Sequence, residues 1–361
     1  MKPFNELTRL GRIRRMRKLA RAALTRYGVN EARFSLVRQA GNTLFRVRTS
    51  DLPAPDAPAG LFEQGQYLLR VHEPGYQAPD ALDLELTWLT AMRREANLPV
   101  PEPIPTLEGQ WLLPVDVPGV PGTRNCSLLR WVKGRSVKDR FRPHHLRAQG
   151  RLMAQLHQFS TRWQPPAGLG KRKFDWDGLF QNDVGSGMAN GEAWALLSPL
   201  HRQAFSFVAE RLRHVMDDWG QGLDVFGLIH GDLGVDANLF FWHGEPRAID
   251  FDDSGYGYWV FDLAVALDAC RDDPAYPRYR EALLDGYAKF RSLPVQQAEQ
   301  IELFLAGLQV YWNLWATGGT HLYPRLLPEF GERIARTADF VVRYARREGC
   351  PIAPTTEMEC K

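Results

Sequence analysis

The chain reads LIHGDLGVDANLFFWHGEPRAIDFDDSGYGYWVFDL from residue 228 to residue 263. Short apolar runs alternate here with polar turns, which predicts three strands in quick succession. A hairpin formed by the second and third strands would bring Asn238 close to Asp250. The three strand-like runs are residues 225–229, 239–242 and 247–251.

Three polar residues stand at the ends of these runs: Asp232, Asn238 and Asp250. The set suits phosphoryl transfer, in which one Asp positions the attacking hydroxyl and takes its proton, while an Asn and a second Asp hold Mg²⁺. Magnesium prefers hard oxygen ligands and takes few of them from the protein. Each residue alone is explained more simply as a turn residue. Their order along the chain favours the functional interpretation.

The ordered motifs HGD, Asn and IDFDDSGYG, followed by DLA, resemble the aminoglycoside phosphotransferase/choline kinase superfamily. Members of that superfamily have a protein-kinase-like fold, and the resemblance covers about residues 20–345 of this chain. It implies ATP and Mg²⁺ as cofactors. It also implies that Asp232 is the catalytic base, that Asn238 and Asp250 bind the metal, and that Asp262 braces the catalytic loop.

The loop departs from the family pattern in its length. Five residues separate Asp232 from Asn238, where the family usually has four. Either the loop bulges by one residue, or Asp236 takes part of the metal role. We favour Asn238, because the apolar strand begins directly after it. Carboxylates at Asp236, Asp252 and Asp253 also favour a cationic or amino-bearing acceptor, although the last two are equally explained as structural residues.

Residues near the N-terminus are expected to lie over the nucleotide phosphates. Residues 34–38 and 44–48 read as strands, and residues 39–43 between them read as a turn that contains Asn42. In the resembled family this strand–turn–strand unit covers the phosphates, as the Gly-rich loop does in protein kinases. A plain hairpin is the simpler alternative.

Arg70 stands in the third expected strand, where a kinase carries a Lys that grips the phosphates. Arginine is always charged and binds phosphate oxygens with two parallel donors, so it can serve this purpose. Glu85, on a helical pattern over residues 79–96, matches the helix residue that pairs with the strand cation. An exposed strand Arg and a solvated helix Glu are the ordinary alternatives.

Residues 126–134 form an apolar run that ends at Gly134. The run resembles the strand that leads to the hinge between the two lobes of a kinase. The resemblance implies that backbone groups from about Leu129 to Trp131 bind the adenine base.

The expected fold class is α+β: a protein-kinase-like two-lobed fold with a small β-rich N-lobe and a larger helical C-lobe. A length of 361 residues, 44% of them hydrophobic and 24% charged, suits one such enzyme. The expected parts are a basic N-terminal extension (1–16), the N-lobe (17–128), the C-lobe with the catalytic and metal site (129–348) and a flexible tail (349–361).

Charge is uneven along the chain. Residues 1–30 hold nine Lys or Arg against one acid, a local charge of +8 within a net charge of +3. A solvated helix face explains this segment better than a tether to nucleic acid or to an anionic membrane, so no nucleic-acid partner is expected. The four cysteines show no metal or disulfide spacing, and no apolar run is long enough to cross a bilayer. The sequence therefore predicts a cytoplasmic location.

Together these features predict an ATP- and Mg²⁺-dependent transfer of the γ-phosphate to a hydroxyl of a small, amino-bearing molecule. A Ser/Thr protein kinase of the stress-response type on the same fold is one alternative. A nucleotide-binding protein without catalysis is another, favoured by the longer loop and by Arg70. The acceptor, the choice of ATP over GTP and the oligomeric state are left open by the sequence.

Overall fold

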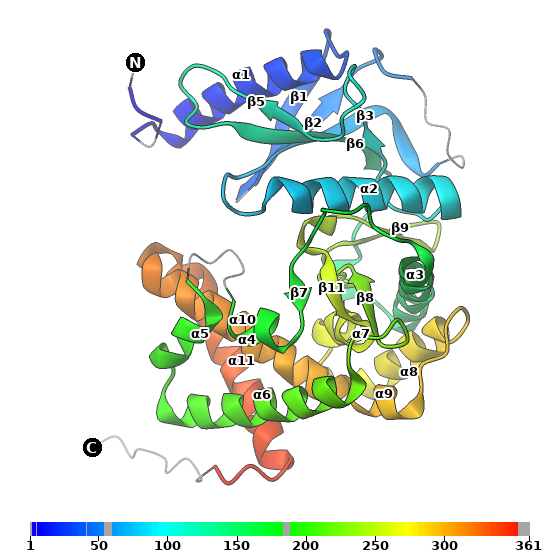
Figure 1. Ribbon diagram of the computed structural model, residues 1–361, viewed down its shortest axis with the longest axis vertical. Helices are drawn as coiled ribbons and strands as arrows, with labels where there is room; N and C mark the ends of the chain where they lie inside the picture. The colour runs from blue at the N-terminus through cyan, green and yellow to red at the C-terminus, as the bar shows by residue number, and fades with distance from the viewer. Residues whose placement is uncertain (1, 5, 41, 54–59, 183–187, 353–361) are drawn as a thin grey trace.

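The computed structural model describes residues 2–4, 6–40, 42–53, 60–182 and 188–352. These residues form two lobes, one above the other in Figure 1. The N-terminal lobe contains a six-stranded sheet, and the other lobe is mainly helical. The predicted α+β class, with a small sheet-rich lobe and a larger helical lobe, is confirmed.

The sheet of the N-terminal lobe is antiparallel, with strands in the order β1-β2-β3-β6-β4 and with β5 also paired to β6. Alternate residues of β2 are buried, as expected for a sheet with one covered face. The strands are β1 (Arg33–Ala40), β2 (Asn42–Arg48), β3 (Phe62–Val71), β4 (Pro103–Ile104), β5 (Leu113–Val115) and β6 (Arg124–Val132).

The first two strands reach further than the sequence predicts. Residues 39–43 were expected to form a turn, but Gln39 pairs with Thr43 and Ala40 pairs with Asn42. The prediction of a five-residue turn was therefore wrong, because backbone pairing continues through polar and small side chains that carry no strand signal. Gly41 lies outside the described residues.

Two long helices belong to the N-terminal lobe: α1 (Arg9–Arg26) and α2 (Pro79–Ala96). Helix α1 buries one apolar stripe against the sheet, and its basic residues lie mainly on the exposed face. The helix continues without a break across residue 16. Helix α2 begins at a proline, which is favoured in the first turn because its missing N–H has no partner there anyway.

Helix α2 packs with the helical lobe rather than with α1. Figure 1 shows it between the sheet and the lower lobe. Its buried leucines and Trp88 belong to the large apolar core of that lobe, whereas α1 and the sheet share a smaller core. The Trp88 ring meets the Phe251 ring edge-on at a centroid distance of 5.6 Å. Helix α2 therefore joins the lobes by sharing the core of the helical lobe, while α1 and the sheet keep a separate core.

The helical lobe is built around α10, which is apolar on most of its surface and buried along most of its length. The helices of this lobe are α3 (Pro143–Arg162), α4 (Trp176–Phe180), α5 (Asn190–Ala193), α6 (Pro199–Trp219), α7 (Trp259–Asp268), α8 (Tyr276–Tyr287), α9 (Val295–Glu299), α10 (Ile301–Leu322) and α11 (Leu327–Arg347). Among the described residues, no helix is long and apolar enough to cross a membrane.

Five short strands of this lobe carry the motif-bearing loops. Two strands form the expected hairpin, and the other three form a small sheet in the order β7-β11-β8. The hairpin strand expected at 247–251 ends at Ala248, so Asp250 stands beyond it. The strands are β7 (Lys173–Phe174), β8 (Phe226–Ile229), β9 (Leu239–Trp242), β10 (Glu245–Ala248) and β11 (Gly255–Tyr258).

The expected tail falls partly outside the described residues, since it includes residues 353–361. The predicted flexibility of that tail stays a prediction.

Helices α3 and α8 cross at two glycines. A larger residue at this crossing should therefore lower the stability of the protein. A Cβ atom added at Gly150 would lie 2.1 Å from the backbone oxygen of Leu283. We therefore expect Gly150→Ala to lower the free energy of unfolding by at least about 1–3 kcal/mol, because two backbones would have to separate. Urea unfolding followed by circular dichroism measures this change.

Gly331→Ala on α11 is the matched control. Its new Cβ atom would meet only Leu327 at an ordinary 3.6 Å, so helix propensity should raise stability by about 0.5–1 kcal/mol. Equal stability of Gly150→Ala and the unmodified protein would contradict the close crossing of α3 and α8.

Candidate active site

The loop after β8 is held by the carboxylate of Asp262 on α7. The backbone N–H groups of His230 and Gly231 donate to its two oxygens at 3.1 and 2.8 Å. The His157 ring donates from Nε2 at 3.1 Å. Gly231 has a φ of 78°, a left-handed conformation that glycine adopts without strain. One buried carboxylate therefore fixes the start of the loop, the bracing role that the resemblance implies for Asp262.

The hydrogen bonds keep Asp262 ionised. Burial alone would raise the pKa of its carboxyl, but the hydrogen bonds from His157 and from the backbone N–H of Gly231 bring the pKa below its usual range. Burial lowers the pKa of His157, so its ring is neutral and places its one proton on Nε2. The other ring nitrogen, Nδ1, lies 2.9 Å from the hydroxyl of Tyr287.

Asp232 and Asn238 are in direct contact. The amide nitrogen of Asn238 donates to the Asp232 carboxylate at 2.8 Å and to its backbone oxygen at 2.9 Å. The amide oxygen of Asn238 must then point away from Asp232. Burial raises the pKa of Asp232 well above its usual range, and Asp253 and Asp250 raise it further. A raised pKa makes the Asp232 carboxylate a stronger base than an exposed Asp.

The extra loop residue is absorbed in a tight turn. Gly234 donates its backbone N–H to the Asp232 carbonyl at 3.1 Å, and Ala237 donates to the Gly234 carbonyl at 3.2 Å. The turn leaves Asp236 exposed, with its backbone oxygen bound by the Ser136 hydroxyl at 3.0 Å. Asn238 thus reaches Asp232 despite the longer loop.

The hairpin brings Asp250 beside Asn238, as the sequence predicts. Ile249 donates its backbone N–H to the Asn238 carbonyl at 3.0 Å. Asp250 then adopts a left-handed conformation, with a φ of 63°, which turns the chain into a short 3₁₀ segment, Phe251–Asp253. Burial raises the pKa of Asp250, while Arg70 lowers it. Asp250 therefore lies close to a cation of the N-terminal lobe.

Arg70 and Glu85 form the ion pair that the sequence predicts. Arg70 NH2 lies 2.6 Å from Glu85 Oε1, and the two side chains are only 5% and 0% exposed. Arg70 Nε also donates to the Ser127 hydroxyl at 3.3 Å. The pair is therefore part of the interior, and the solvated alternatives for both residues are excluded.

Lys171 is a third charged residue beside Arg70 and Glu85, and it was not among the site residues predicted from the sequence. Its Nζ lies 3.8 Å from Glu85 Oε2 and 3.4 Å from the backbone oxygen of Asp252, and its side chain is 1% exposed. Burial lowers the pKa of Lys171 to about 8, against the opposing charge of Glu85. The irregular basic run at residues 171–173 gave no signal that would single out this lysine.

Asp252 binds the N-terminal lobe. Asn42 donates to one of its carboxylate oxygens at 2.8 Å, and Gln77 donates to the other at 3.1 Å. The Asn42 amide oxygen in turn accepts the backbone N–H of Glu73 at 3.0 Å. Burial raises the pKa of Asp252 to about 7, with Arg70 opposing. Asn42 therefore links its strand–turn–strand unit to the segment that follows Asp250.

Asp253 is likewise engaged by protein groups. Arg172 lies 3.1 Å from its carboxylate, and the Tyr76 hydroxyl donates to the same oxygen at 3.1 Å. In this structure Asp252 and Asp253 thus bind side chains of the protein itself. Asp236 is the candidate acceptor-binding carboxylate that remains exposed.

The expected base-binding residues lie at the end of the N-lobe sheet. Leu129 is buried in mid-strand, where it pairs with Leu68 of β3 and Pro103 of β4. Trp131 lies two residues further on, and Arg46 stacks over its ring at 4.4 Å. The chain then crosses to the helical lobe through Arg135, which bridges to Phe241. The part of these residues in base binding stays a prediction.

Arg333 of α11 is a second residue that the sequence did not reveal. Its charge lowers the pKa of both Asp232 and Asp236, in each case against the larger effect of burial. Arg333 stacks over the Trp312 ring at 4.4 Å. This side of Asp232 therefore presents charges of both signs beside an aromatic ring.

The residues present fit a magnesium ion. Asn238 and Asp250 supply one amide oxygen and one carboxylate, and Mg²⁺ usually takes one or two protein oxygens and completes its shell with water and phosphate. In the described part of the chain, no cluster of three His, Cys, Asp or Glu residues is arranged to hold a metal by itself. The mutual repulsion of Asp232, Asp250 and Asp253 is a surplus of negative charge that a cation would relieve.

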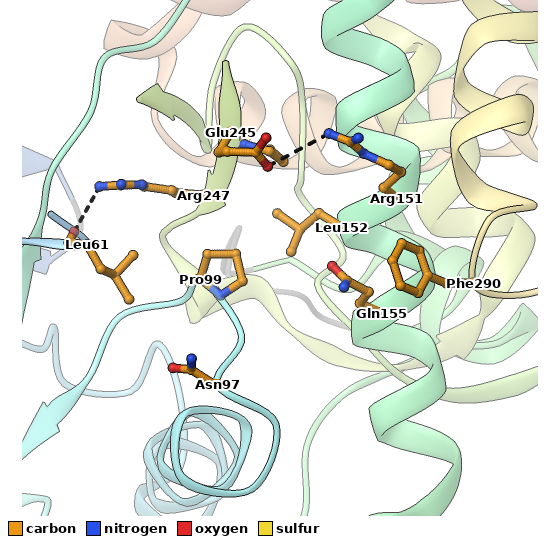
Figure 2. A pocket seen from close by; sticks show the side chains of 10 residues that line it. Leu61, Asn97, Pro99, Arg151, Leu152, Gln155, Glu245, Arg247 and Phe290 are labelled. Carbon is orange, nitrogen blue, oxygen red and sulfur yellow. Dashed lines mark hydrogen bonds and ion pairs between the residues drawn. The ribbon is translucent and has the colours of Figure 1, made fainter. Parts of the chain in front are cut away.

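A separate pocket of about 350 Å³ lies near the crossover between the lobes, and Figure 2 shows its lining. Arg247 NH1 donates there to the backbone oxygens of Gly60, Leu61 and Lys133 at 2.6–3.0 Å. None of the predicted site residues lines this pocket. Arg247 ties the two lobes together at this position and has no place in the chemistry proposed below.

Comparisons with known proteins find a matching family and several relatives. A model of the phosphotransferase enzyme family matches residues 42–295. Homoserine kinase from Sinorhizobium medicae is 26% identical over 250 residues, which cover 68% of this chain and 70% of that protein. The alignments to the amicoumacin kinase of Bacillus subtilis and to a further curated relative span 66% of each of those proteins.

Solved structures confirm the protein-kinase-like fold. A microcompartment-associated aminopropanol kinase superposes with a TM-score of 0.67 at 25% identity and covers 93% of this chain and 99% of its own. An amicoumacin kinase in complex with AMP-PNP, Ca²⁺ and Ami superposes with a TM-score of 0.64 at 17% identity and covers 86% of this chain and 88% of its own.

The role of Asp262 is open to a stability test. Asp262→Asn keeps the size of the side chain but turns an NH₂ group toward backbone N–H donors. We expect a loss of about 1–3 kcal/mol in the free energy of unfolding at pH 7, measured by urea unfolding. Asp218→Asn, the same change on the exposed face of α6, should leave stability within about 0.5 kcal/mol.

The same pair of variants has a pH dependence with a defined sign. The pKa of Asp262 is lower in the folded than in the unfolded protein, so its stabilisation is present above the unfolded pKa of about 4. It is lost as the pH falls through the folded pKa. The gap between Asp262→Asn and the unmodified protein should therefore shrink below about pH 4; a constant gap would contradict an ionised Asp262.

Proposed function

Since the chain belongs to the phosphotransferase enzyme family, whose kinases use ATP to phosphorylate hydroxyl groups, we propose that it moves the γ-phosphate of ATP, with Mg²⁺, to a hydroxyl of a small, amino-bearing molecule. One observation carries the proposal. The loop braced by Asp262 brings Asp232, Asn238 and Asp250 together next to the buried Arg70–Glu85 pair.

Asp232 acts on the acceptor. One of its carboxylate oxygens is held by Asn238, so the other, Oδ1, faces the acceptor hydroxyl and takes its proton. The acceptor oxygen forms a bond to the γ-phosphorus while the bond from that phosphorus to the bridging oxygen of ADP breaks. Because little covalent chemistry falls to the protein in this reaction, positioning and charge supply most of the catalysis.

The remaining residues hold the nucleotide. The Asn238 amide oxygen and the Asp250 carboxylate would hold Mg²⁺, which when bound would supply positive charge to the phosphates. Glu85 orients Arg70, whose guanidinium stays in one place because Ser127 binds it from the other side. The N-terminal unit at Asn42 is held over the site by Asp252.

An amino-bearing acceptor is supported by charge and by the relatives. Asp236 is exposed on the side of Asp232 that faces Arg333, where an ammonium group could pair with it. Aminopropanol kinase and homoserine kinase are named for acceptors that carry an amine beside a hydroxyl. Small amino alcohols and hydroxy amino acids are therefore the first acceptors to try.

The test is ATP consumption with Mg²⁺ and a panel of amino alcohols, homoserine, aminoglycosides, sugars and a generic protein substrate. Asp232→Asn should lower acceptor-dependent turnover by about 10²–10⁴-fold, because the general base is removed. Its affinity for ATP should stay close to that of the unmodified protein. Asp218→Asn is the matched control, with unchanged turnover expected.

Three outcomes would count against the proposal. Unchanged turnover in Asp232→Asn would remove the assignment of the base. Turnover with the protein substrate alone would favour the Ser/Thr protein kinase. Binding of ATP without turnover of any acceptor would favour a nucleotide-binding protein without catalysis.

The magnesium dependence of turnover distinguishes carboxylates that bind the metal from carboxylates that bind the acceptor. Asp250→Asn should raise the Mg²⁺ concentration for half-maximal turnover by about tenfold or more, because it removes a charged ligand. Asp236→Asn should leave this concentration unchanged and weaken the binding of amine-bearing acceptors instead. A raised Mg²⁺ requirement in Asp236→Asn would show that the exposed loop carboxylate, rather than Asn238, serves the metal.

A further inference from the structure

We propose that Lys171, a residue of the helical lobe, is a second phosphate-binding cation of this kinase, beside Arg70. The proposal rests on the proposed function, since it concerns the nucleotide phosphates. The first observation is that the two cations beside Glu85 lie at unequal distances from its carboxylate. Arg70 lies 2.6 Å from one carboxylate oxygen, whereas Lys171 lies 3.8 Å from the other.

Arg70 has most of its binding capacity committed within the N-terminal lobe. Its NH2 group is held by Glu85 and its Nε by the hydroxyl of Ser127, at 2.6 and 3.3 Å. The guanidinium stands on a central strand and is 5% exposed. Arg70 thus provides a charge held in one place, whereas the lysine that kinases carry at this position is flexible.

Lys171 has donors to spare. An ammonium group offers three N–H donors, and ordinary hydrogen bonds to oxygen measure 2.7–3.2 Å. The contacts of Lys171 with Glu85 and with the Asp252 carbonyl, at 3.8 and 3.4 Å, are both longer than this range. The Asp252 carboxylate is bound by Asn42 and Gln77 instead.

Burial makes this arrangement costly for a protein without a ligand. The Lys171 side chain is 1% exposed, and a buried ammonium group is expensive unless it is paired and hydrogen-bonded. Two cations approach the single carboxylate of Glu85, and among the described residues Lys171 has no carboxylate oxygen within hydrogen-bond distance. A phosphate oxygen would supply the missing partner.

The backbone places Lys171 beside the metal-binding turn. Its neighbour Arg172 accepts the backbone N–H of Tyr256 at 2.9 Å, and the next two residues form β7, which is paired with β11. Strand β11 follows directly after the segment Phe251–Asp253, which itself follows Asp250. Lys171 therefore stands on a fixed segment next to Asp250, where Mg²⁺ would hold the phosphates.

In the nucleotide complex, Lys171 would turn from Glu85 to a phosphate oxygen while Arg70 keeps its place on Glu85. One cation then comes from each lobe, and the phosphates lie between them. Closure of the two lobes on the nucleotide would thereby be coupled to the presence of its phosphates. Adenosine, which has no phosphate, would gain nothing from Lys171.

The experiment compares ADP and adenosine, each titrated with Mg²⁺ present by calorimetry, on the full-length protein. Lys171→Met should weaken ADP binding by about 10–100-fold, the range for one charge-assisted hydrogen bond, and leave adenosine binding unchanged. Lys171→Arg, which keeps the charge, should recover part of the loss. Lys173→Met is the matched control: it removes an exposed lysine two residues away and should change neither affinity.

The outcomes are distinct. Equal ADP affinity in Lys171→Met and the unmodified protein, or an equal loss for ADP and adenosine, would overturn the proposal and leave Lys171 as a structural link between the lobes. Thermal unfolding of each variant shows that the affinities come from folded protein. Absence of ADP binding by the unmodified protein would instead overturn the proposed function, and this inference with it.

Discussion

The site depends on one buried carboxylate. Asp262 accepts hydrogen bonds from two consecutive backbone N–H groups and from a neutral His157, so the first residues of the catalytic loop have a single conformation. A buried anion with three donors is satisfied, whereas three donors without it would each lack a partner. The position of Asp232, one residue beyond Gly231, follows from this anchor. The position of this loop therefore comes from a buried residue of α7.

A second constraint links the two lobes through packing. Glu85 and Trp88 are one helical turn apart on α2, and the Trp88 ring packs on Phe251, the residue after Asp250. An apolar contact thus holds the helix that carries Glu85 against the segment that follows Asp250. Helix α2 shares the core of the helical lobe, whereas most of the sheet shares a separate core with α1. Trp88 and Phe251 therefore belong to one core, although they come from different lobes.

Charge is distributed unevenly across the site. Burial and mutual repulsion raise the pKa of Asp232, Asp250 and Asp252, while the nearby cations Arg70 and Lys171 share Glu85. A bound metal ion would offset the negative charge of the aspartates, and phosphate oxygens would offset the positive charge of Arg70 and Lys171. The charges of this site are therefore unbalanced in the protein alone, and bound ligands would balance them.

The sequence by itself determined the α+β class, the hairpin that joins Asn238 to Asp250, and the Arg70–Glu85 pair. These features are legible because short-range spacing and ordered motifs constrain them. Tertiary structure alone decided that Lys171 reaches Glu85, that Asn42 binds Asp252, and that Arg333 lies near Asp232. Each of these contacts joins segments far apart in the chain, and their side chains meet only because packing of the two lobes brings the backbones together. No local pattern encodes that approach, since a lysine in an irregular stretch looks the same whether it faces water or a buried carboxylate.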